Sequence, residues 1–209
     1  MNQTKQNILS HSRQLFNEFG TTNVSLRTIA DNLEISVGNL QYHFKKREDI
    51  IEGLYFELVE EMNTIMVEPT GKLLESVLDI STRMIFKLYD YRFFFLDFVT
   101  ITRKNEVIKQ HYSELSQQRE AQFLQISEVM IQNSIFREER LKGEYLGLFK
   151  RIELMTNFWF SSVLIQENAI SEACLEDFKW MIHQSMFPYL TVRGREEFAA
   201  SFPHLMSPQ

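Results

Sequence analysis

Apolar side chains recur with the period of an α-helix along most of the chain. In residues 4–19, for example, Ile8, Leu15 and Phe19 fall on one face of a helix with 3.6 residues per turn. Only 7 Gly and 4 Pro interrupt such patterns in 209 residues, too few for the many turns of a β-sandwich or β-barrel. We therefore predict an all-α fold.

The same periodicity predicts the positions of the helices. We expect them over residues 4–19, 26–33, 37–43, 47–66, 72–88, 91–102, 105–136, 144–168, 171–190 and 195–206. The helix that begins at residue 47 is expected to join a small three-helix head to a larger helical body. We place the domain boundary here, with residues 1–50 in the head and residues 51–209 in the body.

The composition excludes several classes of protein. Cys174 is the only cysteine, so no intramolecular disulfide and no cysteine-based zinc site is expected. The first ten residues are polar, and no apolar run approaches the ~18–20 residues that cross a bilayer. We expect a cytoplasmic protein. The sequence lacks a glycine-rich phosphate loop and a recognisable catalytic constellation, so we predict no enzyme, no cofactor and no metal.

Residues 25–43 have the outline of a helix-turn-helix. Ser25 and Ser36 each precede a short helical segment and are expected to cap it, and Gly20 is expected to end the first helix in a left-handed conformation. About three residues separate the two short helices. In this motif the second helix enters the major groove of DNA.

The charge distribution permits such a role. Residues 1–50 carry six basic and five acidic side chains, whereas the whole chain has a net charge of −6. An acidic protein can bind nucleic acid when its cations share one face, because binding depends on the local field.

The spacing of residues in the head resembles that of the TetR family of bacterial transcription regulators. The resemblance covers about residues 5–55 and rests on Ile8, Ser12, Leu15, Phe16, Gly20, Ile29, Ala30, Ile35, Ser36, Gly38, Leu40, His43, Phe44, Arg47, Glu48 and Ile50. It implies an all-helical homodimer, usually a repressor, that binds a palindromic operator. Its body would bind a small effector that changes the spacing of the two heads and releases the DNA. A helical ligand-binding or protein-interaction module with weakened or lost operator recognition is the alternative.

The resemblance also implies which residues contact DNA. Val37, Asn39 and Gln41 would face base edges, where amide side chains suit adenine and Val37 suits a thymine methyl group. Arg27 would reach a guanine edge or a phosphate. The remaining contacts, mostly to the DNA backbone, would come from Ser25, Thr28, Ser36, Tyr42, His43, Lys46 and Arg47.

Three residues depart from the family pattern. Glu34 stands where the family often has Gly, so we expect a differently shaped turn. Gln41 occupies the position of a common phosphate-contacting Tyr, and Tyr42 points ~100° away from that position. Arg47 replaces the usual Lys and keeps its charge.

The two lysines between the short helix and helix 47–66 have two interpretations. Lys45 and Lys46 either stabilise the carboxyl end of helix 37–43 or share a DNA phosphate at the start of the next helix. His43 is likewise either a packed cap or a phosphate donor.

Aromatic residues in the body suggest a largely apolar effector. The candidate contacts are Phe86, Phe94, Phe98, Asn157 and Phe158. Three consecutive residues, Phe93 to Phe95, cannot share one face of a helix. We therefore expect at least one of them to meet something other than the core of its own domain, such as a pocket or a partner subunit.

The last two long helices carry broad apolar faces that predict a four-helix interface between two copies of the chain. The candidate contacts are Trp159, Ser162, Val163, Gln166, Phe178, Ile182, Ser185 and Met186. The alternative is that these helices only close their own domain.

Overall fold

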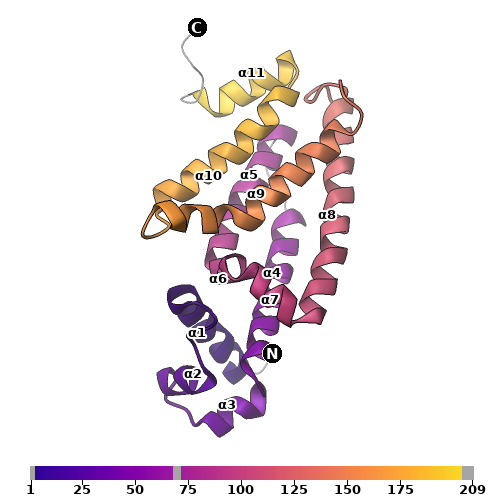
Figure 1. Cartoon of the computed structure of the whole chain (residues 1–209). Coiled ribbons are helices and arrows are strands. Elements are labelled where there is room, and N and C mark those ends of the chain that lie inside the picture. Colours follow the sequence, from indigo (N-terminus) through magenta and orange to yellow (C-terminus); the bar gives the residue numbers. More distant parts are fainter. Residues whose placement is uncertain (1–2, 68–71, 204–209) are drawn as a thin grey trace. The chain divides into compact units, whose positions relative to one another are not determined.

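The computed structural model describes residues 3–67 and 72–203, and these residues confirm the all-α fold (Figure 1). The helices are α1 (Gln3–Phe19), α2 (Leu26–Asn32), α3 (Val37–His43), α4 (Arg47–Val67), α5 (Leu73–Asp90), α6 (Arg92–Leu96), α7 (Phe98–Lys104), α8 (Glu106–Gln132), α9 (Glu144–Gln166), α10 (Glu172–Met186), the 3-10 helix η1 (Phe187–Tyr189) and α11 (Val192–Ser201). The described residues contain no strand, only an isolated antiparallel bridge between Phe136 and Leu190.

Several predicted helices have different ends in the structure. The single helix expected over 91–102 is divided at Asp97 into α6 and α7. The helix expected over 105–136 ends at Gln132, because Ser134 adopts a positive φ of 56°. The last helix begins at Val192 rather than at residue 195, because Thr191 caps it by accepting a hydrogen bond from Gly194 N–H. Residues 204–206 of the predicted helix lie outside the described residues.

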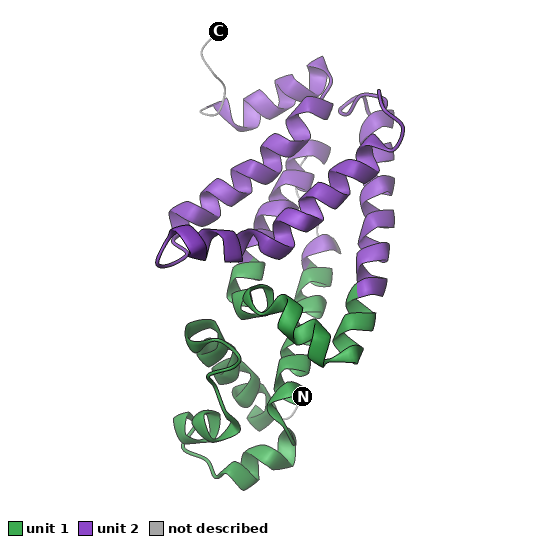
Figure 2. Ribbon diagram, viewed as in Figure 1, with its two compact units in different colours: residues 1–64, 87–112 green, residues 65–86, 113–209 purple. Residues whose placement is uncertain are grey.

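The chain forms two compact units, coloured separately in Figure 2. The first comprises residues 1–64 and 87–112, and the second comprises residues 65–86 and 113–209. Helices α4, α5 and α8 each contribute residues to both units. The division at residue 50, which separates two functions rather than two compact units, stays a prediction.

The first unit has a core of apolar side chains from α1 to α4 and α6. Leu40 and Phe44 from the α3 segment are buried together with Ile29 of α2 and Leu54 of α4. Helix α1 ends at Gly20, whose φ of 76° confirms the predicted left-handed stop. Burial of these faces, rather than helix propensity, holds such short helices in place.

The two ends of α6 are tied to the end of α1 within the first unit. The Asn17 side chain donates to the Asp90 carbonyl at 2.7 Å and accepts from Phe93 N–H at 3.0 Å. The Asp97 carboxylate accepts from both the backbone N–H and the hydroxyl of Thr21. The Phe16 ring contacts the Phe93 ring at 5.4 Å between centroids.

The expectation for the three consecutive Phe is met only in part, since Phe93 contacts Phe16 of the predicted head, outside the core of the predicted body. Phe93, Phe94 and Phe95 are all buried in the chain itself. Phe94 stacks on Tyr55 with ring centroids 5.2 Å apart. All three can be buried because α6 spans only five residues and is covered by its neighbours on more than one side.

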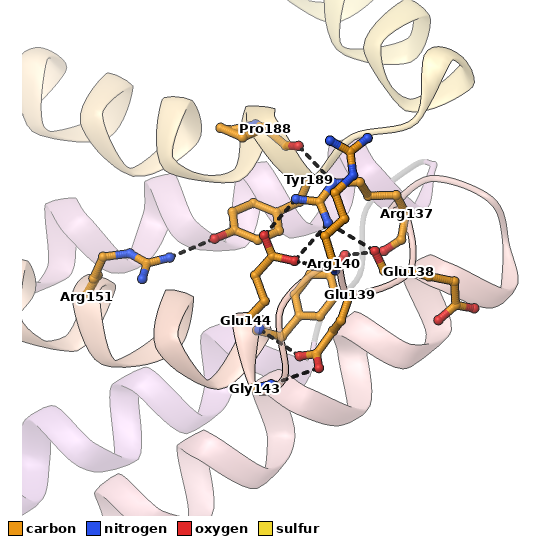
Figure 3. A network of polar contacts seen from close by, with 10 residues as sticks. Arg137, Glu138, Glu139, Arg140, Gly143, Glu144, Arg151, Pro188 and Tyr189 are labelled. Carbon is orange, nitrogen blue, oxygen red and sulfur yellow. Dashed lines mark hydrogen bonds and ion pairs between the residues drawn. The ribbon is translucent and has the colours of Figure 1, made fainter.

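The second unit is closed by a polar network at the α8–α9 connection (Figure 3). Arg137 donates two parallel hydrogen bonds to the Glu144 carboxylate, at 2.9 and 2.8 Å. The pKa of Glu144 is lowered to about 2, chiefly by these bonds and next by the Arg140 backbone N–H. Arg137 also lies over the Tyr189 ring at 5.1 Å, which joins this connection to η1.

Candidate nucleic-acid interface

The turn between α2 and α3 keeps a left-handed residue although it contains no glycine. Glu34 has a φ of 54°. Ile35 N–H donates to the Ala30 carbonyl at 3.0 Å, and Glu34 N–H donates to the Asp31 carbonyl at 3.2 Å. These are the two bonds of a Schellman motif, which usually has glycine at its left-handed position. The predicted change of turn shape is therefore wrong: the hydrogen bonds hold Glu34 in a conformation that costs about 1–2 kcal/mol without glycine.

Helix α3 is capped as the sequence predicts. The Ser36 hydroxyl accepts a hydrogen bond from Asn39 N–H at 3.1 Å. Ser25 caps α2 in the same way through Thr28 N–H at 3.1 Å, and the Thr28 hydroxyl accepts from Ser25 N–H in return. These caps fix the start of each short helix, so the hydroxyls position the helices in addition to any contact with DNA.

One face of α3 is packed and the other is exposed. Leu40 is fully buried, whereas Asn39, Gln41 and Tyr42 are exposed. Tyr42 is 86% exposed, and its ring contacts only that of the neighbouring His43 among the described residues. The exposed part of α3 is therefore open to a partner along Asn39, Gln41 and Tyr42.

The amide side chains on this face have no hydrogen-bond partner among the residues that the structure describes. This holds for Asn39 and for Gln41, while Val37 is half-buried at the edge of the face. Both amides can therefore offer a donor and an acceptor to a base edge at no internal cost.

Exposed cations precede and follow α3 in the chain. Arg27 is largely exposed and lies 3.8 Å from Asp31, and Lys46 lies 3.9 Å from Asp49. Both are surface ion pairs that contribute little to stability and exchange readily for a phosphate. Asp49 also accepts from Lys46 N–H at 3.1 Å, so the start of α4 is partly capped by its own residues.

Arg47 is placed differently from the other predicted anchors. Its guanidinium donates to the Glu48 carboxylate at 3.1 Å, and its side chain is only 26% exposed. Its Nε–H is buried without a hydrogen-bond partner among the described residues. Arg47 is therefore less free than the other predicted anchors, because one of its guanidinium donors is engaged by Glu48, and its contact with a DNA phosphate stays a prediction.

The predicted effector contacts are divided between the two compact units. Phe94 and Phe98 belong to the first unit, whereas Phe86, Asn157 and Phe158 belong to the second. Phe94 is a core residue, and Phe158 is exposed on α9. Aromatic composition alone does not distinguish a ligand pocket from a core, and the set therefore stays a prediction without support from burial.

Four of the predicted dimer contacts are core residues of the chain itself. Trp159 stacks on Phe178 with centroids 4.4 Å apart, and Ile182 and Met186 are buried beside them on α10. Contacts within the second unit already cover them, so their assignment to a subunit interface stays a prediction without support from burial. Ser162 and Gln166 are exposed, and Val163 and Ser185 are half-buried.

A different face of α9 is exposed and apolar. Leu154, Phe158 and Ile165 are exposed on it, with Ser162 between them, and Met181 is exposed on α10. The spacing of 154, 158, 162 and 165 places these four side chains on one side of a helix. The same spacing is readable in the sequence, but the more apolar neighbouring face obscured it.

The described parts of the chain hold neither a candidate metal cluster nor a membrane-spanning helix. No group of three or more His, Cys, Asp and Glu residues there is placed to hold a metal ion. Nor is any helix there both long and apolar enough to span a membrane.

Comparison with known proteins agrees with this arrangement. A family model described as bacterial regulatory proteins of the tetR family matches residues 8–54, and one described as bacterial transcriptional repressor matches residues 57–198. No curated protein matches the chain.

Solved structures of the same fold include three regulators. A TetR-family regulator from Marinobacter aquaeolei is 25% identical, with a TM-score of 0.78, over 97% of this chain and 98% of that one. A regulator from Saccharomonospora viridis in complex with choline is 16% identical, with a TM-score of 0.69, over 89% and 96%. A ketosteroid regulator of Mycobacterium tuberculosis is 14% identical, with a TM-score of 0.64, over 91% and 97%. With a helix-turn-helix in its first unit and a repressor model matching most of the rest, the chain belongs to the TetR family of bacterial transcriptional regulators.

Proposed function

We propose that this regulator is a repressor that binds a two-fold symmetric operator as a homodimer and is released by a small, largely apolar effector. The observation that carries the proposal is the exposed face of α3. Asn39 and Gln41 stand there with unused amide groups, beside the exposed ring of Tyr42. A capped helix that leaves such groups unpaired in water is suited to read base edges in the major groove.

Direct binding tests the operator part of the proposal. A fluorescently labelled duplex from the promoter of the chain's own gene is titrated with full-length protein between roughly 50 and 200 mM salt. We expect tighter binding than to a shuffled duplex, with affinity falling as salt rises. Half-sites should be centred about 34 Å apart or somewhat more. Equal affinity for both duplexes would contradict the proposal.

The homodimer is proposed to form through α9 and α10. The exposed residues Leu154, Phe158 and Ile165 on α9 and Met181 on α10 supply apolar surface that a monomer would leave in water. A two-fold axis would bring the same patch of each copy together, as in an isologous interface.

The effector is proposed to bind in the second unit. Most of its buried residues are apolar, with Ser76, Ser127 and His183 as buried polar exceptions. A structure of the same fold holds choline and another is a ketosteroid regulator, but at 16% and 14% identity these support the fold alone. A thermal-shift screen of small apolar molecules, followed by release of labelled duplex, identifies the class.

The alternative is a helical module whose head has weakened or lost operator recognition. The observation that favours it is the acidic character of the turn, where Asp31 and Glu34 are both exposed. Under this alternative, Asn39→Ala would leave retention of duplex DNA unchanged, whereas under the main proposal it would reduce it.

A further inference from the structure

The first unit carries a pocket that the proposed reading face of α3 does not use. Three segments form it: the α1–α2 connection, the first turns of α4 and the end of α7. Its lining residues are Thr21, Thr22, Arg47, Glu48, Ile51, Thr100, Ile101, Lys104 and Asn105.

Three of these residues present accessible hydrogen-bond donors that nothing in the described chain uses. The Nε–H of Arg47 is also unpaired, but it is buried and does not reach the pocket surface. Lys104 is exposed and forms no ion pair with a described residue, and the hydroxyls of Thr22 and Thr100 have no described partner. By contrast, the polar groups of Thr21 and Asn105 are engaged elsewhere.

The charges of the pocket favour an anion. Arg47 and Lys104 contribute two positive charges, and the Glu48 carboxylate, which works against an anion, is held by Arg47 at 3.1 Å. Ile51 and Ile101 are buried and form an apolar part of the lining. Donors beside apolar side chains interact more strongly with an anion than donors surrounded by water.

We propose that this pocket binds a phosphoryl group. The Lys104 ammonium and the hydroxyls of Thr22 and Thr100 would donate to its oxygens, and the Arg47 guanidinium would add a positive charge beside it. Charge-assisted bonds of this kind are shorter and stronger than neutral ones. The group has two possible sources, a phosphodiester of bound DNA or the free phosphate of a small molecule. Binding of a DNA phosphodiester rests on the proposed function, whereas binding of a free phosphate does not.

Inorganic phosphate tests the free source on the full-length protein. The midpoint of thermal unfolding is followed as sodium phosphate replaces sodium chloride at constant ionic strength. We expect phosphate to raise the midpoint of the wild type, and Lys104→Ala or Thr100→Val to weaken phosphate binding about tenfold. The matched control is Arg103→Ala, which removes the neighbouring exposed cation that does not line the pocket.

The salt dependence of duplex binding tests the DNA source. We expect Lys104→Ala to reduce the slope of log affinity against log salt by about 0.9, while Arg103→Ala leaves it unchanged. Either response, in phosphate or in DNA, supports the proposal and identifies the source. If Lys104→Ala behaves as Arg103→Ala does in both measurements, the pocket does not bind a phosphoryl group. Wild-type protein that fails to bind any duplex would contradict the proposed function, and the phosphate titration alone would then decide on the pocket.

Discussion

Asp97 accepts two hydrogen bonds from Thr21, one from its backbone N–H at 3.0 Å and one from its hydroxyl. Thr21 is buried at the end of the helix that precedes the helix-turn-helix, and Asp97 lies at the break between α6 and α7. The carboxylate at the break between α6 and α7 therefore holds the connection between α1 and α2, which leads into the helix-turn-helix.

Removing this carboxylate should destabilise the protein. Asp97→Ala leaves two donors of buried Thr21 unpaired, and we expect a loss of about 1–3 kcal/mol in the free energy of unfolding, measured in urea. Thr22→Ala is the control, because the neighbouring Thr22 is exposed and has no described hydrogen-bond partner. Equal stability of the two variants would show that the Thr21–Asp97 contact does not form.

Relieving the left-handed residue of the turn should stabilise the head. We expect Glu34→Gly to raise the free energy of unfolding by about 0.5–1 kcal/mol, since glycine adopts a positive φ without strain. Glu34→Gln removes the charge but keeps the conformation, so it separates the two effects. A gain that Glu34→Gln reproduces would be electrostatic and would argue against strain.

Reading and anchoring residues should respond differently to salt. Asn39→Ala is expected to cost about 1–3 kcal/mol in discrimination between operator and shuffled duplex, with an unchanged salt slope. Lys46→Ala is expected to weaken both duplexes alike and to reduce the slope by about 0.9. Lys109→Ala, which removes an exposed lysine paired with Glu106 on α8, should do neither. The interface is misassigned if Lys46→Ala matches Lys109→Ala.

A charge on the exposed face of α9 should separate the subunits. Ile165 is 85% exposed, so we expect Ile165→Glu to stay folded while its mass in light scattering falls from that of a dimer to that of a monomer. Leu141→Glu changes a similarly exposed residue in the α8–α9 connection and should remain dimeric. Phe178→Ala should instead cost about 3–5 kcal/mol in stability, because Phe178 is a core residue. A dimeric Ile165→Glu would place the interface elsewhere.

The Arg137–Glu144 pair should make stability depend on acid pH. The pKa of Glu144 is lowered from its ordinary 4.5 to about 2 in the folded protein, chiefly by hydrogen bonds from Arg137. The stabilisation is therefore complete above about pH 4.5 and is lost as the pH falls toward 2. Urea unfolding between these values should show a smaller pH dependence for Glu144→Gln than for the wild type. An identical dependence would exclude Glu144 as the responsible group.

Local features of the head could be predicted from the sequence because they depend on residues within three or four positions. The caps of Ser25 and Ser36 and the left-handed Gly20 are such features, and all three are confirmed. The conformation at Glu34 could not be predicted in this way, because the hydrogen bonds of the turn overcome the preference of the side chain.

Features that join distant segments could not be predicted. Asp97, at the break between α6 and α7, accepts hydrogen bonds from Thr21, which lies 76 residues earlier in the sequence. Periodicity likewise showed that α10 has an apolar face but not that Trp159 of α9 covers it at Phe178. The sequence likewise identified Arg47 as a cation but did not show that its guanidinium donates a hydrogen bond to Glu48.

The discontinuity of the first unit has a consequence for truncated proteins. Phe16, Asn17 and Thr21 all find their partners in residues 87–112, which a gene fragment ending at residue 64 would not encode. Such a fragment would expose the Phe16 ring and leave the polar groups of Asn17 and Thr21 without their hydrogen-bond partners. We therefore expect the helix-turn-helix to need residues 87–112 for a stable fold, although those residues are synthesised well after it.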